Sequence, residues 1–528
     1  MEQSDKKKSW YNHAIFYEIY PLSFKDSKGD GEGDLEGLIS KLDYLQWLGI
    51  TAIWLCPITV SSMRDYGYDV CDYKNIDPRF GTLETFKKLT TEMHKRGMYL
   101  VMDFVINHTS HKHPWFIESK SSLHNPKRDW YIWRDGKDGK HPNNWKNISM
   151  GDSAWTHDPH TNQYYFHQFL KEQPDLNWRN EEVKSAMKDI MEFWIAHGVD
   201  GFRIDAILHV IEAEHLKDEP LLSNFSKHPF NHNHYYEMDH IYTRDQPELA
   251  QVLEFLSDIA KSHGEILLLS EAYGSPERLA EFYKYTPHGN QAPINFSLVD
   301  ESWSVKKYRE HINSFESALA KDDTRIYTLG THDVPRAASR VGPVNARVMA
   351  LLLMTLPGSP FIYYGDELGM TNTTIKTRDT RDHFAAIGSF IRDQVRTPMQ
   401  WDSSEHAGFT SGTPWLPVNS NKKHINVEDE KSDTNSTLHL YRNLIKIRKD
   451  IPTLVYGQYY PYNDSHPQIL SYERRLDDST LRIYLNFTSK LLTIDIPQNS
   501  TLLFSTHNKN NKTSATLEPH EGIIIKIS

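Results

Sequence analysis

The stretch GFRIDAI, residues 201–207, reads as a buried β-strand that carries two opposite charges. Because side chains on a strand alternate between its two faces, Arg203 and Asp205 point the same way, and the apolar residues around them point the other way. An arginine beside an aspartate can hold the carboxylate ionised without leaving either charge alone in hydrocarbon. These seven residues leave two interpretations open: a structural ion pair, or a functional pair at the mouth of a barrel.

Short apolar runs of the same kind recur along the chain, with amphipathic stretches of helical period between most of them. Several of the helical stretches end at a glycine, which is typical of a helix C-terminus. Eight alternations of strand and helix predict an α/β fold, a closed parallel (β/α)₈ TIM barrel. The predicted strands are 14–21, 50–57, 98–105, 199–205, 265–271, 294–299, 326–333 and 359–367.

Two segments interrupt this alternation, and a third departs from it at the end of the chain. Residues 109–173 are too long for a plain loop and contain short strand-like pieces, which predicts an inserted subdomain. Residues 370–430 are also irregular, and we expect them to overhang the barrel mouth. From residue 455 to 528, strands follow one another without helices, which predicts a C-terminal antiparallel β-sandwich. The barrel would then consist of residues 1–108 and 174–454.

The composition limits the partners and the location of the protein. A hydrophobic share of 38% and a charged share of 24% predict a globular chain with a core. A formal charge of −11, without a basic patch, argues against nucleic acid as a partner. The N-terminus lacks an apolar signal region, and the longest apolar run, 348–356, is too short to cross a bilayer. With only two cysteines, a cytoplasmic location is expected; a monomer and a homo-oligomer both remain open.

Polar residues gather where the predicted strands end. In TIM barrels the active site lies at the C-terminal ends of the strands. Each of these residues alone could be a helix cap or a turn former. Together they crowd like charges at one rim, which costs stability unless function requires it. The residues are Asp103, Asn107, His108, Arg203, Asp205, Glu271, His332 and Asp333.

Four of these strand ends carry motifs of a known family. DFVINH (103–108), GFRIDAI, LLSEAYG (268–274) and GTHDVPR (330–336), in this order, resemble the four signature regions of the α-amylase superfamily, glycoside hydrolase family 13. Further motifs are similar to its α-glucosidase and oligo-1,6-glucosidase branch, and most like bacterial α-1,4-glucosidases (maltases). They are DYGYD (65–69), QPDLNW (173–178), FIYYGDELGM (361–370) and RTPMQWD (396–402).

The resemblance implies a retaining glycosidase that works by double displacement. Asp205 would be the nucleophile, Glu271 the general acid/base, and Asp333 the third carboxylate, which holds sugar hydroxyls. Arg203 would keep Asp205 anionic by lowering its pKa, whereas Glu271 must stay protonated near neutral pH. In such enzymes the two reacting carboxyl groups stand about 5–5.5 Å apart. The chemistry would need no cofactor.

The resemblance also implies a clamp for one glucose unit at the non-reducing end of the substrate. We expect Asp65 and Arg396 to pair and close the pocket floor, which would make the enzyme exo-acting on short oligosaccharides. Ala206, directly after the nucleophile, is similar to the residue found in α-1,4-cleaving maltases, whereas a valine there is typical of α-1,6-cleaving relatives. The expected substrate-binding residues are Asp65, Tyr68, His108, Phe169, Arg203, Ala206, His332 and Arg396.

The loop DSKGDGEGD, residues 26–34, is similar to a calcium loop of the family. Its ligands would be Asp26, Asp30, a backbone oxygen of Glu32, and Asp34, and hard oxygen ligands suit Ca²⁺. Lys28 departs from the pattern, because an ammonium group cannot bind a cation. The sequence therefore leaves open whether the loop holds a structural calcium ion.

Two other functions fit the same resemblance. A transglucosidase, a sucrose-active enzyme or an oligo-1,6-glucosidase would share the first half-reaction, and only the loops that receive the acceptor would differ. A non-catalytic, glycosidase-like subunit of a membrane transporter is disfavoured by the complete set of three carboxylates and by the absence of a membrane anchor in the sequence.

Overall fold

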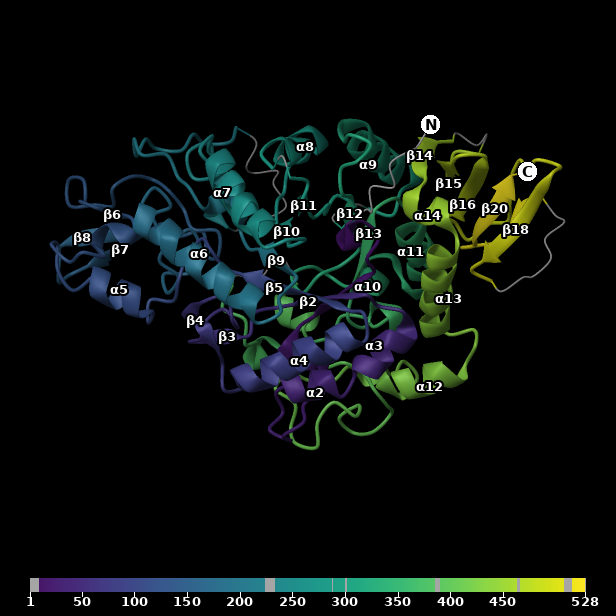
Figure 1. The fold of residues 1–528 in the computed structure, drawn as a ribbon, viewed down its shortest axis with the longest axis horizontal. Coiled ribbons are helices and arrows are strands. Elements are labelled where there is room, and N and C mark those ends of the chain that lie inside the picture. The colour runs from purple at the N-terminus through teal and green to yellow at the C-terminus, as the bar shows by residue number, and fades with distance from the viewer. Residues whose placement is uncertain are drawn as a thin grey trace.

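The computed structural model describes residues 9–223, 233–286, 288–299, 302–384, 390–462, 466–507 and 515–527. A barrel occupies the centre, a small sheet of β6, β7 and β8 lies at one end of the molecule, and the C-terminal strands lie at the other end (Figure 1). The long axis of the molecule therefore runs from the inserted segment through the barrel to the C-terminus.

Eight parallel strands of the described residues form one sheet in the order β11-β10-β9-β5-β2-β1-β13-β12. A parallel bridge between Asn295 and Tyr327 joins its two end strands, so the sheet closes on itself. The predicted TIM barrel is confirmed. The strands are β1 (Phe16–Ile19), β2 (Ala52–Leu55), β5 (Tyr99–Phe104), β9 (Gly201–Ile204), β10 (Leu267–Ser270), β11 (Gln291–Pro293), β12 (Ile326–Thr328) and β13 (Ser359–Tyr363).

The sixth barrel strand lies a few residues before the predicted position. We expected it at 294–299, but β11 ends at Pro293. Gln291 keeps its place in the interior because its side-chain amide donates to Ser270 Oγ at 2.7 Å. The apolar residues that follow are buried in a turn after the strand. Hydrophobicity alone therefore predicted the wrong start, because this strand contains a glutamine and a proline.

Helices cover the outside of the barrel (Figure 1). One of them, α11, is buried on nearly all sides, because the barrel lies on one side and β16 and β20 of the C-terminal sheet pack on the other. Its all-round apolar sequence follows from this position. The helices are α1 (Pro21–Phe24), α2 (Leu35–Ile39), α3 (Leu42–Leu48), α4 (Leu83–Lys95), α6 (Glu181–Ala196), α7 (Leu249–Ser262), α8 (Pro276–Lys284), α9 (Val305–Ala318), α10 (Ala337–Val341), α11 (Pro343–Thr355), α12 (Val427–Ser432), α13 (Thr437–Asp450) and α14 (Pro452–Tyr456).

The segment between β5 and α6 folds as a small unit over one side of the barrel mouth. It contains α5 (Pro114–Ser119) and an antiparallel sheet of β6 (Trp133–Arg134), β8 (Gln163–Phe166) and β7 (Trp155–Asp158). Its own core is largely aromatic and includes Trp145, Trp155 and Phe166. A hairpin of β3 (Thr59–Ser61) and β4 (Val70–Ile76) precedes it in the chain.

The connection from β9 to α7 is a third long segment at the mouth, which the sequence analysis did not predict. Glu219 is buried there and accepts hydrogen bonds from three successive backbone amides, residues 241–243. Asn144 Nδ2 donates to Glu219 O at 2.9 Å, and Asn233 Nδ2 donates to Ile148 O at 3.0 Å. The described part of this connection is thereby attached to the inserted unit.

The C-terminal strands form an antiparallel sheet, as predicted. Its order is β14-β15-β16-β20-β18, and β17 pairs with β19 beside it. The Trp303 ring, just before α9, stacks on Phe487 at 3.7 Å and attaches this sheet to the barrel. The strands are β14 (Gln458–Pro461), β15 (Ile469–Leu476), β16 (Ser479–Asn486), β17 (Leu492–Thr493), β18 (Ser500–Ser505), β19 (Thr516–Leu517) and β20 (Gly522–Ile527).

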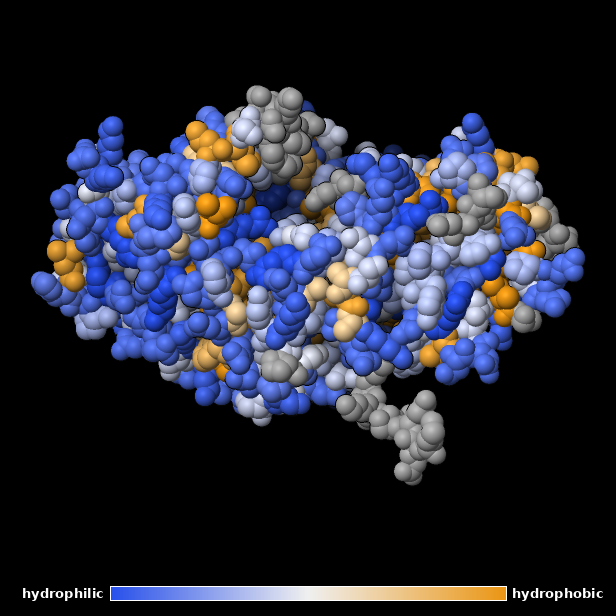
Figure 2. All heavy atoms as spheres, turned by 90° about the horizontal axis from the view of Figure 1, so that it is seen from above, coloured by the Kyte–Doolittle hydropathy of each residue, from blue (hydrophilic) through white to orange (hydrophobic). Residues whose placement is uncertain are grey.

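Hydrophilic side chains cover most of the face seen in Figure 2, and hydrophobic residues appear there in separate small groups. Among the described residues, no helix combines the length and the apolar character that crossing a bilayer requires.

Candidate functional site

A cavity of about 430 Å³ opens at the C-terminal ends of the barrel strands. Three segments line it: the inserted unit, the β9–α7 connection and the residues after β13. Of the predicted catalytic and substrate-binding residues, eight lie on the wall: Asp65, Tyr68, His108, Phe169, Asp205, Ala206, Glu271 and Asp333. The remaining three, Arg203, His332 and Arg396, lie behind the wall and are at most 2% exposed.

Arg203 is the centre of the charged cluster. Its Nη1 contacts Asp205 Oδ1 at 2.6 Å and Asp103 Oδ1 at 2.7 Å, and its Nη2 contacts Glu271 Oε2 at 2.9 Å. Asp205 and Glu271 therefore lie within the span of one guanidinium group, from neighbouring strands β9 and β10. Both carboxylates, Asp205 and Glu271, line the cavity, so the Arg203–Asp205 pair lies at the barrel mouth.

The expected effect of Arg203 on its neighbour is outweighed by burial. Burial raises the pKa of Asp205 well above its ordinary value, and Arg203 only opposes that rise. Glu271 and Asp103 raise the pKa of Asp205 further, because one positive charge serves three carboxylates. Arg203 lowers the pKa of Asp205, as predicted, but burial and the two neighbouring carboxylates outweigh this effect, so the expectation that Arg203 keeps Asp205 anionic is not met. Burial thus favours a retained proton on the Asp103 and Asp205 side of Arg203, where both pKa values are raised.

The backbone of Ala206 connects the ends of β9 and β10, the two strands that precede Asp205 and Glu271. Its amide donates to Glu271 Oε2 at 2.9 Å, which orients that carboxyl toward Asp205. Its φ of 47° lies in the left-handed region, where a β-branched side chain is strained. The small alanine side chain therefore suits both the backbone and the cavity wall.

The third carboxylate, Asp333, lies among cations and His332. Arg396 Nη2 contacts Asp333 Oδ1 at 2.5 Å, and His332 Nε2 lies 3.2 Å from Asp333 Oδ2. Burial would raise the pKa of Asp333, but His332, Arg396 and Arg392 together hold it well below its usual range. Asp333 is therefore an anion at neutral pH.

The pocket floor is closed by an ion pair that differs from the predicted one. Asp65 Oδ1 contacts Arg392 Nη2 at 2.9 Å, whereas Arg396 turns to Asp333 and donates from Nε to His332 O at 2.9 Å. Arg392 also binds Asp382 Oδ1 at 2.6 Å. The predicted Asp65–Arg396 pair is wrong, because the guanidinium four residues earlier in the chain is closer to Asp65.

The other side of the floor consists of neutral groups. Gln173 Nε2 lies 3.1 Å from Asp65 Oδ2 and 3.0 Å from His108 Nε2. Burial lowers the pKa of His108 to about 4, so its ring is neutral at physiological pH. The Phe169 ring packs against His108, with centroids 5.2 Å apart. An apolar face and hydrogen-bonding groups thus meet at the position expected for a sugar ring.

Several lining residues were not predicted. Arg392 and Asp382 come from the irregular segment after β13, and Asn233, Tyr235 and Arg244 come from the β9–α7 connection. The run IRDQVRTPMQWD (391–402) contains two arginines four residues apart, which was the one signal for Arg392. The others lie in a connection that carries no motif.

In the acidic loop 26–34, hydrogen bonds already occupy the carboxylate oxygens of Asp26 and Asp34, two of the expected calcium ligands. Asp26 accepts hydrogen bonds from the amides of residues 28, 29 and 31 and from Thr410. Asp34 accepts from the amide and hydroxyl of Ser27 and from the Gly37 amide. Asp30 Oδ1 accepts from the amide of Glu32, whose own side chain faces Arg79 at 3.5 Å. These hydrogen bonds argue against calcium in residues 26–34, a question that the sequence left open.

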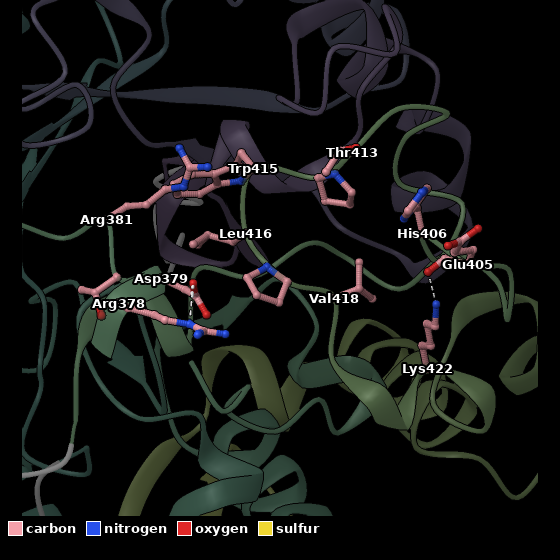
Figure 3. Close-up of a pocket in the computed structure, with 13 residues that line it drawn as sticks. Arg378, Asp379, Arg381, Glu405, His406, Thr413, Trp415, Leu416, Val418 and Lys422 are labelled. Carbon is pink, nitrogen blue, oxygen red and sulfur yellow. Dashed lines mark hydrogen bonds and ion pairs between the residues drawn. The ribbon is translucent and has the colours of Figure 1, made fainter. Parts of the chain in front are cut away.

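A second cavity, of about 670 Å³, lies between residues 378–381 and 405–422. Figure 3 shows Trp415 and Leu416 on its wall, with Arg378 facing Asp379 and Lys422 reaching Glu405. None of the predicted site residues lines it. The chemistry predicted from the sequence is confined to the first cavity.

Comparisons with known proteins agree with this arrangement. A model of the α-amylase catalytic domain matches residues 18–457. The chain is 38% identical to an oligo-1,6-glucosidase of Parageobacillus thermoglucosidasius over 92% of each chain, and 35% identical to Maltase 1 of Drosophila virilis over 99% of this chain and 88% of that one. The crystal structure of an α-glucosyl transfer enzyme, XgtA, matches with a TM-score of 0.91 at 34% identity, covering 98% of this chain and 100% of that chain.

Proposed function

Since the chain belongs to the α-amylase family, glycoside hydrolase family 13, and is a glycoside hydrolase, we propose that it is an α-glucosidase that releases one glucose at a time from short α-glucosides. The observation that carries this proposal is the pair of carboxylates, Asp205 and Glu271, held on one guanidinium at the cavity wall. Retaining glycosidases need two carboxyl groups about 5–5.5 Å apart, and a shared guanidinium group keeps these two close together.

The proposed reaction has two displacements. Glu271 gives its proton to the glycosidic oxygen while Asp205 attacks the anomeric carbon, so the aglycone leaves and a glucosyl ester forms on Asp205. Glu271, now a carboxylate, takes a proton from water, and the resulting attack at the same carbon releases glucose and restores both residues. Asp333 stays ionised throughout, which suits a residue that holds hydroxyl groups and favours positive charge on the sugar ring.

Exo-action is supported by the closed floor of the cavity. Arg392 joins Asp65, Asp382 and, at 3.4 Å, Asp333, so an ion-paired wall stands at this end of the cavity among the described residues. We therefore assign this end to the non-reducing glucose. The aglycone would extend toward the β9–α7 connection, past Tyr235 and Arg244.

For the linkage, we propose a preference for α-1,4 substrates of the maltose type, supported by Ala206 beside the nucleophile. A difference of one or two methyl groups at such a position changes discrimination by about 1–3 kcal/mol. Transfer to a second sugar is the second candidate activity, because an α-glucosyl transfer enzyme has the same fold at 34% identity. The proposed location is the cytoplasm.

The test is proton NMR of the anomeric signals during cleavage of maltose and of isomaltose, with Asp205→Asn as the blank. We expect α-glucose to appear first, faster from maltose, and not at all with the variant. β-Glucose as the first product, or an active Asp205→Asn enzyme, would refute the mechanism. Faster cleavage of isomaltose would refute only the linkage preference, and new oligosaccharides at high maltose concentration would identify transfer.

A further inference from the structure

A buried carboxylate lies behind the cavity wall and contacts none of the reacting groups directly. Glu18, on β1, is 1% exposed. Its Oε1 lies 2.6 Å from His332 Nδ1 and accepts a hydrogen bond from the backbone amide of His332 at 3.2 Å. Burial raises the pKa of Glu18 well above its ordinary value, so this carboxyl group is costly to keep as an anion. The burial of Glu18 is therefore explained only by what this carboxyl group does for His332.

The opposite ring nitrogen of His332 must carry a proton. Nε2 lies 3.2 Å from Asp333 Oδ2, an anion, and 2.9 Å from the Tyr68 hydroxyl oxygen. Tyr68 has one hydroxyl proton, and that proton is donated to Asp103 at 3.0 Å. Both neighbours of Nε2 are then acceptors, so Nε2 is the donor.

This assignment fixes what Glu18 has to do. With Nε2 protonated, a neutral ring would present a bare lone pair from Nδ1 to a carboxylate oxygen 2.6 Å away. A proton must therefore lie between Nδ1 and Oε1, shared by the two groups. Cys56, whose Sγ lies 3.7 Å from both atoms, is the neighbour that completes this buried cluster. Among the described residues, no other charged side chain contacts Nδ1.

We propose that Glu18 is a positioning residue, which holds the His332 ring so that its Nε2 proton always faces Asp333 and the sugar hydroxyl bound there. The inference rests on the proposed function, because it gives Glu18 a role in the glucosidase reaction. Without the carboxyl group, the single ring proton could move to Nδ1. The lone pair of Nε2 would then face Asp333, and the donor would be lost when the transition state forms.

The test compares Glu18→Met, Glu18→Gln and the double variant Glu18→Met with His332→Gln. Glu18→Met keeps the volume but removes the hydrogen bond, and we expect kcat on maltose to fall about tenfold or more, with KM nearly unchanged. Glu18→Gln can donate an amide hydrogen to Nδ1 and should recover most of that loss. Combined with His332→Gln, Glu18→Met should cause no further loss, because Glu18 acts through this ring.

A matched control is available on the outer side of β1. Glu367 is fully buried and accepts hydrogen bonds from Tyr17 and Tyr44, and none of these three residues lines the cavity. Glu367→Met should lower the thermal midpoint while leaving kcat within about twofold. Equal losses from Glu18→Met in the presence and absence of His332 would overturn the proposal, as would a Glu18→Gln enzyme as slow as Glu18→Met.

A spectroscopic measurement covers the case in which Glu18→Met does not fold. Nitrogen NMR of histidine-labelled wild type, with the His332 signals identified by their loss in His332→Gln, should show a proton on Nε2. A bare Nε2 would refute the proposal. This measurement requires no α-glucosidase activity, so a failure of the proposed function would leave it interpretable.

Discussion

At the residue scale, the charged groups of the cavity are balanced as a set and not as pairs. Arg203 serves Asp103, Asp205 and Glu271, while Asp333 has Arg392 and Arg396. Positive charge is therefore scarce on the side of the nucleophile and abundant on the side of the third carboxylate. This asymmetry agrees with the two pKa shifts, because the pKa of Asp205 is raised and that of Asp333 is lowered.

The sign of each carboxylate's effect on stability follows from its pKa. Burial raises the pKa of Asp65 to about 6, against the opposing effect of Arg392. For Asp382, burial acts in the same direction, but Arg392 prevails and lowers the pKa to about 2. Because the pKa of Asp65 is higher in the folded than in the unfolded protein, protonated Asp65 stabilises the fold below about pH 4, and this stabilisation is lost as the pH rises through about 6. At pH 7.5 ionised Asp65 thus costs stability, on the order of 3 kcal/mol, whereas Asp382 contributes stability.

We therefore predict that Asp65→Asn makes the protein more stable and the enzyme worse. At pH 7.5 the thermal midpoint of the variant should exceed that of wild type, and the difference should vanish near pH 4. Its kcat/KM on maltose should fall at least tenfold, which corresponds to a loss of about 1.4 kcal/mol of transition-state stabilisation. Asp382→Asn is the control of opposite sign and should lower the midpoint at pH 7.5. Thermal scans at both pH values check this; a lower midpoint for Asp65→Asn at pH 7.5 would contradict it.

The residues predicted from sequence were those inside motifs. Asp205 and Glu271 directly follow barrel strands and Asp333 lies five residues after β12, so the strand pattern itself brings them to one rim. Arg392 was missed because its partner choice depends on how an irregular segment folds back over the mouth. Sequence spacing could not separate it from Arg396, since both are arginines near the same carboxylates.

At the element scale, the prediction succeeded where one physical signal dominates. Seven barrel strands overlap the predicted apolar runs, whereas β11 lies before its run because polar and proline residues form it. The β9–α7 connection was missed for another reason. Its order depends on contacts with the inserted unit, such as Asn233 with Ile148, and such contacts between distant segments leave no periodic pattern.

The loop 26–34 should be independent of metal. Because the oxygens of Asp26 and Asp34 are already occupied by amide and hydroxyl donors, we expect EDTA to leave the thermal midpoint unchanged within about 1 °C. Asp26→Asn should lower the stability by about 2 kcal/mol or more, equally with EDTA and with calcium, because it loses hydrogen bonds to a charged acceptor. A midpoint that falls in EDTA and recovers with calcium would show that the loop binds the ion after all.

At the scale of the whole molecule, the C-terminal sheet shares its core with the barrel. Leu470, Tyr472 and Ile483 belong to the same buried cluster as the barrel strands. Arg474, on β15, donates to the carbonyl of Thr355 at the end of α11 at 2.5 Å. The strand pattern predicted the sheet but not the core that it shares with the barrel, because that shared core depends on which face of α11 the sheet covers.

We therefore predict one cooperative unfolding transition for the whole chain. Truncation after Tyr456 would expose the outer face of α11 and leave its C-terminal carbonyls without the Arg474 donor, so the shortened protein should be insoluble. Calorimetry of the full chain and expression of the truncated form check this. Two separate transitions, or a soluble and active truncated enzyme, would show that the barrel folds alone.

The position of α11 also governs how the protein is made. This most apolar helix leaves the ribosome well before β16 and β20, the strands that cover it. At a synthesis rate of about 5–20 residues per second, on the order of ten seconds or more pass before the strands that cover α11 are made. During that time the nascent chain exposes a continuous hydrophobic surface, so its yield in cells should depend on chaperone supply and translation speed more than on the stability of the finished barrel.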